Sequence, residues 1–198
     1  MDKMLSVVLP AYNEEQMIKK TAQVVGDLLE KEQIPYELVF VNDGSKDHTW
    51  EKILELKEER AHIKGVCFSR NFGKEAAMYA GLEQSNGDYV VIIDADLQDP
   101  PELIEEMYAT LLEGEYDCVG SRRVTRKGES KIRSFFARQF YKIIRKISQT
   151  DIVDGARDFR MMTRQMVDSI ISVKEYNRFS KGIFAWVGYR TKSVSYTH

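Results

Sequence analysis

The sequence predicts an α/β fold with a mostly parallel central sheet and helices on both faces. Two observations indicate this. From Leu5 to about Gly120, short apolar runs alternate with longer stretches whose apolar residues recur at helical spacing. In addition, the short run Val90–Ile93 consists entirely of valine and isoleucine, which is typical of a strand buried on both faces of a parallel sheet.

Length and composition fit a single domain of this kind. The chain has 198 residues, of which 43% are hydrophobic and 30% charged, as in folded globular proteins. Its net charge of -2 argues against nucleic acid as a partner. No apolar run reaches the roughly 20 residues of a membrane helix. Cys67 and Cys118 share no metal-ligand spacing, so we expect both to be reduced core residues.

The first two strand–helix pairs are predicted from the residues that end each strand and begin each helix. A strand at residues 5–9 ends at Pro10, and Asn13 is placed to cap a helix that begins at Glu14. A second strand at residues 36–41 ends in the turn sequence Asn-Asp-Gly-Ser, and Asp47 can cap the helix that follows from residue 48 to about 60.

The next elements repeat the same order. A strand at 63–69 precedes an alanine-rich helix at 74–84, which stops before Asn86-Gly87. The central strand at 90–93 precedes a helix at 102–112, and Pro101 suits that helix's first turn. Residues 117–120 form a fifth, shorter strand. Later elements are a strand at 157–162, a helix at 165–173, a polar turn or helix start at 177–182 and a last strand at 189–196.

Two carboxylates follow the central strand directly. Asp94 and Asp96 are separated by one small residue at the carboxyl end of that strand, where ligands bind in open α/β sheets. Because two such charges repel each other, a cation beside them is the natural resolution. The alternative is that both are ordinary strand-end residues and one of them caps a helix.

Other polar side chains also follow strands, and parallel pairing would bring them to one edge. These residues are Tyr12, Asn13, Asp43, Arg70, Asp94 and Asp96. Such an edge suits a nucleotide, with a carboxylate for the base or ribose and others for a metal ion on the phosphates. No G-x-G-x-x-G follows the first strand and no P-loop motif is present, so a dinucleotide cofactor and a P-loop are both disfavoured.

The second part of the chain carries a strongly basic segment. Ten Lys or Arg residues and one acid lie between Arg122 and Lys146. Within it, residues 131–147 predict an amphipathic helix with an aromatic and isoleucine stripe. Three alternatives stay open for this stripe: an anionic membrane surface, the rest of this domain, or a second subunit in a homo-oligomer.

Several motifs in order resemble the family 2 glycosyltransferases, which have the GT-A fold. The matching segments are 7–15, 41–45, 71–74, 94–102, 120–123 and 155–160. They are most similar to the polyprenyl-phosphate sugar transferases, a branch that includes dolichol-phosphate mannose synthases and bactoprenol glucosyltransferases. The resemblance implies one catalytic domain over residues 1–198, with a nucleotide-binding half at 1–121 and an acceptor-side half at 122–198.

The resemblance also implies roles for individual residues. The nucleotide would contact Pro10, Tyr12, Glu14, Asp43, Lys74 and Asp94. Asp96 and Gln98, with Asp94 beside them, would hold Mg²⁺ or Mn²⁺ on the diphosphate. Asp158 matches the base that activates the acceptor, although an ion pair to Arg157 or Arg160 is its structural alternative. Candidates for the donor or acceptor phosphate are Arg122, Arg123, Arg178 and Lys181.

The implied reaction transfers a sugar, with inversion, from a nucleoside-diphosphate sugar to a polyprenyl phosphate at the cytoplasmic face of the membrane. UDP is the expected nucleotide, while GDP stays open. Members of this branch commonly continue into membrane helices. The chain is therefore either the catalytic part of a longer protein or a natural member without such helices, and the basic amphipathic helix favours the first alternative. Rival interpretations are a haloacid-dehalogenase-type phosphohydrolase, a nucleotide-sugar-binding protein without catalysis, and a transferase with a protein or polysaccharide acceptor.

Overall fold

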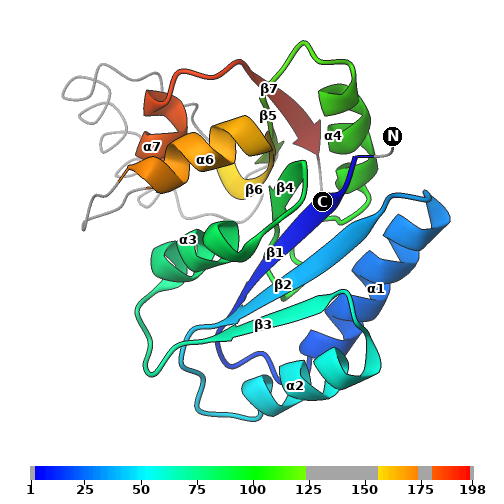
Figure 1. Cartoon of the computed structure of the whole chain (residues 1–198), viewed down its shortest axis with the longest axis vertical. Coiled ribbons are helices and arrows are strands. Elements are labelled where there is room, and N and C mark those ends of the chain that lie inside the picture. Colours follow the sequence, from blue (N-terminus) through cyan, green and yellow to red (C-terminus); the bar gives the residue numbers. More distant parts are fainter. Residues whose placement is uncertain (1–2, 124–155, 174–179, 197–198) are drawn as a thin grey trace, which may run out of the picture.

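A computed structural model of the chain describes residues 3–123, 156–173 and 180–196 (Figure 1). These residues form a seven-stranded sheet of order β3-β2-β1-β4-β6-β5-β7. The strands are β1 (Leu5–Ala11), β2 (Tyr36–Asn42), β3 (Ile63–Cys67), β4 (Tyr89–Ile92), β5 (Cys118–Arg123), β6 (Ala156–Thr163) and β7 (Thr191–Tyr196). The helices are α1 (Ile18–Lys31), α2 (Thr49–Glu59), α3 (Lys74–Gln84), α4 (Leu103–Leu112), α6 (Arg164–Ser172) and α7 (Ser180–Trp186).

The described sheet is mostly parallel, as predicted. β1 pairs in parallel with β2 and β4, β2 with β3, and β5 with β7. β6 is antiparallel to both of its neighbours, β4 and β5. Because β6 runs in the opposite direction, its first residues lie at the sheet edge where the neighbouring strands end. A late segment of the chain thereby reaches the edge that the sequence marks as the site.

Helices cover both faces of the sheet, and β4 lies between the two layers. In Figure 1, α1, α2 and α4 lie on one side of the sheet and α3, α6 and α7 on the other. Val91 and Ile93 belong to the core on the first side, whereas Val90 and Ile92 belong to the core on the second. All four side chains are buried. The prediction of a central strand buried on both faces is therefore confirmed, and apolar burial on both sides fixes the position of the loop after β4.

The close approach of α3 to the sheet depends on a glycine. A Cβ atom on Gly81 would lie 2.2 Å from Cγ1 of Val8 in β1, which is closer than any real carbon contact. Since glycine has no side chain, α3 packs directly on β1 and β2 at this point. This packing holds the first residue of the helix, Lys74, over the end of the sheet.

Two predictions about the helix starts have different outcomes. Helix α1 begins at Ile18 rather than at Glu14, so the prediction that Asn13 caps it is wrong. Asn13 instead has a φ of 57°, and its side-chain oxygen accepts the backbone N–H of Lys46 at 2.8 Å. It therefore joins the loops after β1 and β2. The N-cap position of α2 is His48 rather than Asp47, although Asp47, one residue earlier, accepts the N–H of the first helical residue, Thr49, at 3.1 Å.

The cysteines also differ from each other. Both thiols are free, and Cys118 is buried in the core as predicted. Cys67 is exposed, so its assignment to the core is wrong. The reason is its position at the end of β3, an edge strand of the described sheet, which pairs with a described strand on one side only.

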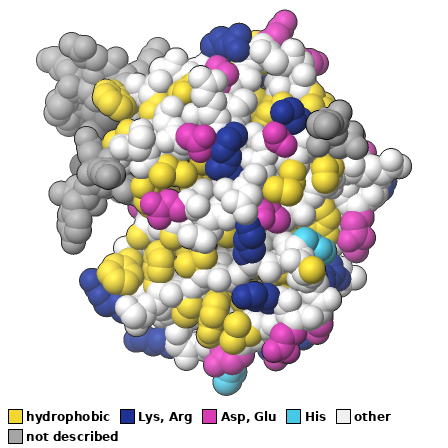
Figure 2. All heavy atoms as spheres, viewed as in Figure 1, with side chains coloured by type: hydrophobic (Ala, Val, Ile, Leu, Met, Phe, Trp, Pro, Cys, Tyr) yellow, Lys and Arg dark blue, Asp and Glu magenta, His cyan; other side chains and the backbone are white. Residues whose placement is uncertain are grey.

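The basic helix predicted at residues 131–147 lies outside the described residues, as does Arg178. On the face shown in Figure 2, the described acidic and basic side chains are interspersed rather than gathered by sign. None of the described helices has the length and apolarity needed to cross a bilayer.

Candidate active site

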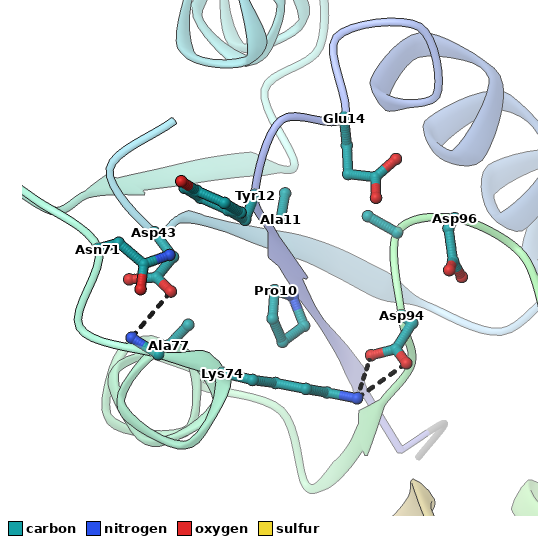
Figure 3. Close-up of a pocket in the computed structure, with 12 residues that line it drawn as sticks. Pro10, Ala11, Tyr12, Glu14, Asp43, Asn71, Lys74, Ala77, Asp94 and Asp96 are labelled. Carbon is teal, nitrogen blue, oxygen red and sulfur yellow. Dashed lines mark hydrogen bonds and ion pairs between the residues drawn. The ribbon is translucent and has the colours of Figure 1, made fainter. Parts of the chain in front are cut away.

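An open cavity of about 400 Å³ lies at the edge where β1, β2 and β4 end (Figure 3). The candidate residues that line it are Pro10, Tyr12, Glu14, Asp43, Lys74, Asp94 and Asp96. They come from the end of β1 and the loop after it, the end of β2, the start of α3, and the loop after β4. The parallel strands thus bring together residues that are distant in sequence.

Tyr12 and Asp43 form one end of the cavity, and Glu14 and Asp96 lie at the other (Figure 3). Asp43 is buried, and its two carboxylate oxygens accept the backbone N–H groups of Phe72 at 2.7 Å and Gly73 at 3.0 Å. Charge-assisted bonds of this kind are stronger than neutral ones. Asp43 therefore fixes the loop that leads into α3, and with it the position of Lys74.

Lys74 joins two of the candidate carboxylates. Its ammonium nitrogen lies 2.7 Å from Oδ1 and 2.8 Å from Oδ2 of Asp94, and 3.0 Å from Oδ2 of Asp158. Burial by itself lowers the pKa of Lys74, but the hydrogen bond and charge of Asp94, together with Asp158, outweigh it and raise this pKa above its ordinary value. The ammonium is therefore charged at neutral pH and bridges β4 to β6.

The register of the sheet explains this bridge. In the antiparallel pair of β4 and β6, Ile92 lies opposite Arg160, so two residues further along Asp94 reaches the level of Asp158. Asp158 enters the site from the reversed strand, and its side chain is mostly buried. Lys74 is a partner of Asp158 that the sequence did not indicate, and the alternative ion pair from Asp158 to Arg157 or Arg160 stays a prediction.

The far end of the cavity is acidic. Burial, followed by the negative charges of Asp96, Asp47 and Asp94, raises the pKa of Glu14 above its ordinary value. Asp96 accepts the backbone N–H of Gln98 at 3.0 Å, and no described cation pairs with it. Hard divalent cations prefer such carboxylate oxygens, so this end fits Mg²⁺ or Mn²⁺. No cluster of three His, Cys, Asp or Glu side chains that could hold a metal ion forms among the described residues.

Gln98 and Arg122 are not among the described residues that line the cavity. Gln98 is exposed in the loop after Asp96, and Arg122 is exposed near the end of β5. The backbones of Arg123 and Lys181 belong to β5 and α7, but their side chains lie outside the described part of the chain, as does the whole of Arg178. The metal-binding role of Gln98 and the phosphate-binding roles of the other four residues stay predictions.

Sequence reasoning missed two residues that shape the site. Asn71 lines the cavity beside Asp43, although only Lys74 was selected from its segment (Figure 3). Thr21 fits the apolar stripe of α1, yet its buried hydroxyl donates to the carbonyl of Ala95 at 2.6 Å, between the two aspartates. A polar residue within an apolar stripe was the available signal for Thr21.

Comparison with known families identifies the chain. Residues 6–171 match the model of the family described as "Glycosyl transferase family 2". The chain belongs to this family. It is therefore a glycosyltransferase with the GT-A fold, as the motifs indicated, and the haloacid-dehalogenase interpretation no longer applies.

One relative is the bactoprenol glucosyl transferase of Shigella phage SfV, which is 40% identical over 192 residues covering 97% of this chain and 62% of the relative. The chain spans 58% to 63% of the length of the curated relatives that it matches. The match therefore concerns part of each relative, and the activity of a whole protein is a separate question.

Solved structures show the same fold at low sequence identity. Glucosyl-3-phosphoglycerate synthase from Mycobacterium tuberculosis, solved with Mn²⁺, UDP-glucose and phosphoglyceric acid, is 23% identical with a TM-score of 0.64, covering 98% of this chain and 70% of its own. A mannosyltransferase from Pyrobaculum calidifontis, solved with GDP-mannose and Mn²⁺, is 20% identical with a TM-score of 0.65, covering all of this chain and 57% of its own.

Proposed function

We propose that this glycosyltransferase moves a sugar from a UDP-sugar to a polyprenyl phosphate, with inversion at the anomeric carbon and with Mg²⁺ or Mn²⁺. The observation that carries the proposal is the arrangement around Lys74. A cavity with Tyr12 and Asp43 at one end and acidic residues at the other is linked by this side chain to the carboxylate of Asp158. The 40% identity to a bactoprenol glucosyl transferase supports the lipid acceptor.

In this proposal the donor nucleotide lies along the cavity. Tyr12, Pro10 and Asp43 contact the base and ribose, and the diphosphate lies toward Asp96. A bound Mg²⁺ or Mn²⁺, held by Asp96 with Asp94 near it, would stabilise the charge that develops on the leaving diphosphate. Glu14 lies beside Asp96 and favours a cation at this end for the same electrostatic reason.

Asp158 faces the acceptor. A phosphate acceptor is already ionised at neutral pH, so Asp158 has more to do in orienting it than in removing a proton. Lys74 holds this carboxylate at a fixed distance from Asp94 and offsets the repulsion between the two negative charges. After the diphosphate leaves, the same ammonium is positioned to attract it. Arg122, Arg123, Arg178 and Lys181 are the further candidates for phosphate contacts.

Titration calorimetry tests the donor site. UDP, GDP and their sugars are titrated into the wild type, with and without Mn²⁺. We expect Mn²⁺-dependent binding of UDP that is lost in Asp96→Ala and retained in Asp27→Ala, which removes an exposed acid on α1 outside the cavity. If no nucleotide bound under any metal condition, the proposal would be contradicted. Preferential binding of GDP would show that the donor base is guanine rather than uracil.

A product assay tests the acceptor. The wild type is incubated with UDP-glucose or UDP-N-acetylglucosamine, Mn²⁺, and either polyprenyl phosphate, polyprenol or a soluble glycan. Mass spectrometry should detect a glycosylated lipid phosphate with the first acceptor alone. Transfer to the glycan but not to the lipid phosphate would contradict the lipid acceptor and support a transferase with a non-lipid acceptor.

A further inference from the structure

Asp99 is a buried acid that the proposed chemistry does not use. It lies three residues after Asp96 in the loop between β4 and α4, and its side chain is only 3% exposed. A carboxylate in such a place is unfavourable unless other groups hydrogen-bond to it or pair with its charge. Both kinds of partner are present, and they come from two strands that are distant in sequence.

The partners of Asp99 are on β7 and β6. The hydroxyl of Tyr196, near the end of β7, donates to Oδ1 of Asp99. The guanidinium Nε of Arg157 lies 3.7 Å from the same oxygen. Arg157 immediately precedes Asp158 in β6, so Asp99 connects the loop that carries Asp96 with the strand that carries Asp158.

The two connections of β6 lie on opposite faces of the sheet. Phe159 and Met161 pack in the core under α4, and Arg157 shares their alternation. Asp158 points the other way, to Lys74 on α3. The start of β6 is thus held to the end of β4 by Lys74 on one face and to the following loop by Asp99 on the other.

We propose that Asp99, held by Tyr196 and Arg157, is a positioning residue that sets the placement of Asp96 relative to Asp158. The proposal rests on the proposed function for the roles of those two aspartates, whereas the connection itself rests on the contacts above. Without the Tyr196 hydroxyl, the buried carboxylate of Asp99 loses a hydrogen-bond donor. We expect the loop between β4 and α4 to become more mobile as a result. Removing a residue that holds the side chains of a metal site in place typically reduces enzyme activity by about 10-fold to 100-fold.

The test compares Tyr196→Phe with Tyr108→Phe. These tyrosines are 8% and 9% exposed, and Tyr108 donates from its hydroxyl to the carbonyl of Lys3, at the opposite end of the sheet. Each variant loses one buried hydroxyl, so general destabilisation should be similar. Asp99→Asn, which keeps the shape and removes the charge, is the second variant, and thermal unfolding shows that each protein is folded.

Hydrogen–deuterium exchange is the first measurement. The amides of Leu97 and Gln98 bond within the loop, to the carbonyl of Asp94 and the side chain of Asp96. We expect their exchange to be at least threefold faster in Tyr196→Phe and Asp99→Asn than in wild type and unchanged in Tyr108→Phe. Equal exchange in the two tyrosine variants would overturn the proposal.

Steady-state kinetics is the second measurement. In Tyr196→Phe we expect kcat to fall on the order of tenfold while the donor KM, measured at saturating Mn²⁺, changes less than twofold, since Asp96 is kept and only its placement relative to Asp158 is loosened. Faster loop exchange with an unchanged kcat would overturn the positioning role. If the wild type transfers no sugar to any acceptor, the proposed function fails, and the exchange rates still decide whether Asp99 ties the loop to β6.

Discussion

Lys74 is the residue that joins the two carboxylates of the site, Asp94 and Asp158. Its ammonium contacts Asp94 and Asp158, which belong to segments that are far apart in the sequence and adjacent in the sheet. Two carboxylates at this separation would repel each other without a cation between them. Lys74 therefore both links two distant segments of the chain and offsets the repulsion between two carboxylates of the site. Variants can separate these two effects.

Replacing Lys74 with methionine removes the charge and keeps most of the side-chain volume. We expect turnover to fall on the order of a hundredfold, because Asp158 loses its fixed position and a small displacement of a reacting group has effects of this size. Lys64→Met is the matched control. Lys64 is 37% exposed against 40% for Lys74, and it forms an equally short ion pair, 2.7 Å to Glu37, away from the cavity. A similar loss of turnover per folded molecule in both variants would contradict the role of Lys74.

Asp158→Asn tests the acceptor side by itself. Asparagine keeps the shape of the side chain, so UDP binding in calorimetry should stay within about twofold of wild type, while turnover should fall by about 10²-fold or more. The lost charge, rather than a lost contact with the donor, is the reason. Intact turnover in a radiometric transfer assay would remove Asp158 from the mechanism.

At the scale of elements, the packing of α3 on β1 determines where Lys74 lies. A methyl group at Gly81 would meet Val8 at 2.2 Å, so Gly81→Ala must push the helix outward. We expect the free energy of unfolding in urea to fall by about 1–3 kcal/mol, the usual range for overpacking, although alanine favours helix by about 1 kcal/mol.

Gly120→Ala in β5 is the control for that variant, because a Cβ atom there meets no other atom of the described chain within 4 Å. It should change the unfolding free energy little. In Gly81→Ala we also expect weaker UDP binding, since the displaced helix carries Lys74 away from Asp94. Unchanged stability and binding in Gly81→Ala would show that α3 is not held by this contact.

At the scale of the whole molecule, another buried carboxylate joins the strands at the edge of the sheet opposite the candidate site. Glu37 in β2 accepts the hydroxyl of Ser6 and the backbone N–H of Asn86, each at 2.7 Å, and pairs with Lys64. Burial raises the pKa of Glu37, but the hydrogen bonds from Lys64, Asn86 and Ser6 outweigh it and hold that pKa below the ordinary 4.5.

This lowered pKa fixes the sign of the pH dependence. Ionised Glu37 stabilises the fold above about pH 4.5, and its contribution is lost as the pH falls through the still lower pKa of the folded state. We expect Glu37→Gln to reduce the free energy of unfolding at pH 7 by about 1–3 kcal/mol. The gap between variant and wild type should narrow below pH 4.5 in urea unfolding. A gap that is constant with pH, as expected for the exposed control Glu83→Gln, would contradict this.

The sequence by itself determined the alternation of strands and helices, the double burial of β4 and the gathering of Tyr12, Asp43, Asp94 and Asp96 at one edge. Each of these follows from information that is local in the chain: the period of apolar residues, the turn residues that end a strand, and the rule that parallel strands end together. The family also followed from local motifs, which the match over residues 6–171 confirms.

Only the tertiary structure decided which distant residues meet. The reversed direction of β6 places Asp158 opposite Asp94, and the packing of α3 inserts Lys74 between them. The connection of Asp99 to Tyr196 likewise depends on the β6-β5-β7 strand order. Strand order and direction arise from the packing of whole elements against each other, and no local pattern of residues specifies them. Strand order also explains why Cys67 is exposed. Its apolar run predicted a core position, but β3 lies at an edge of the sheet.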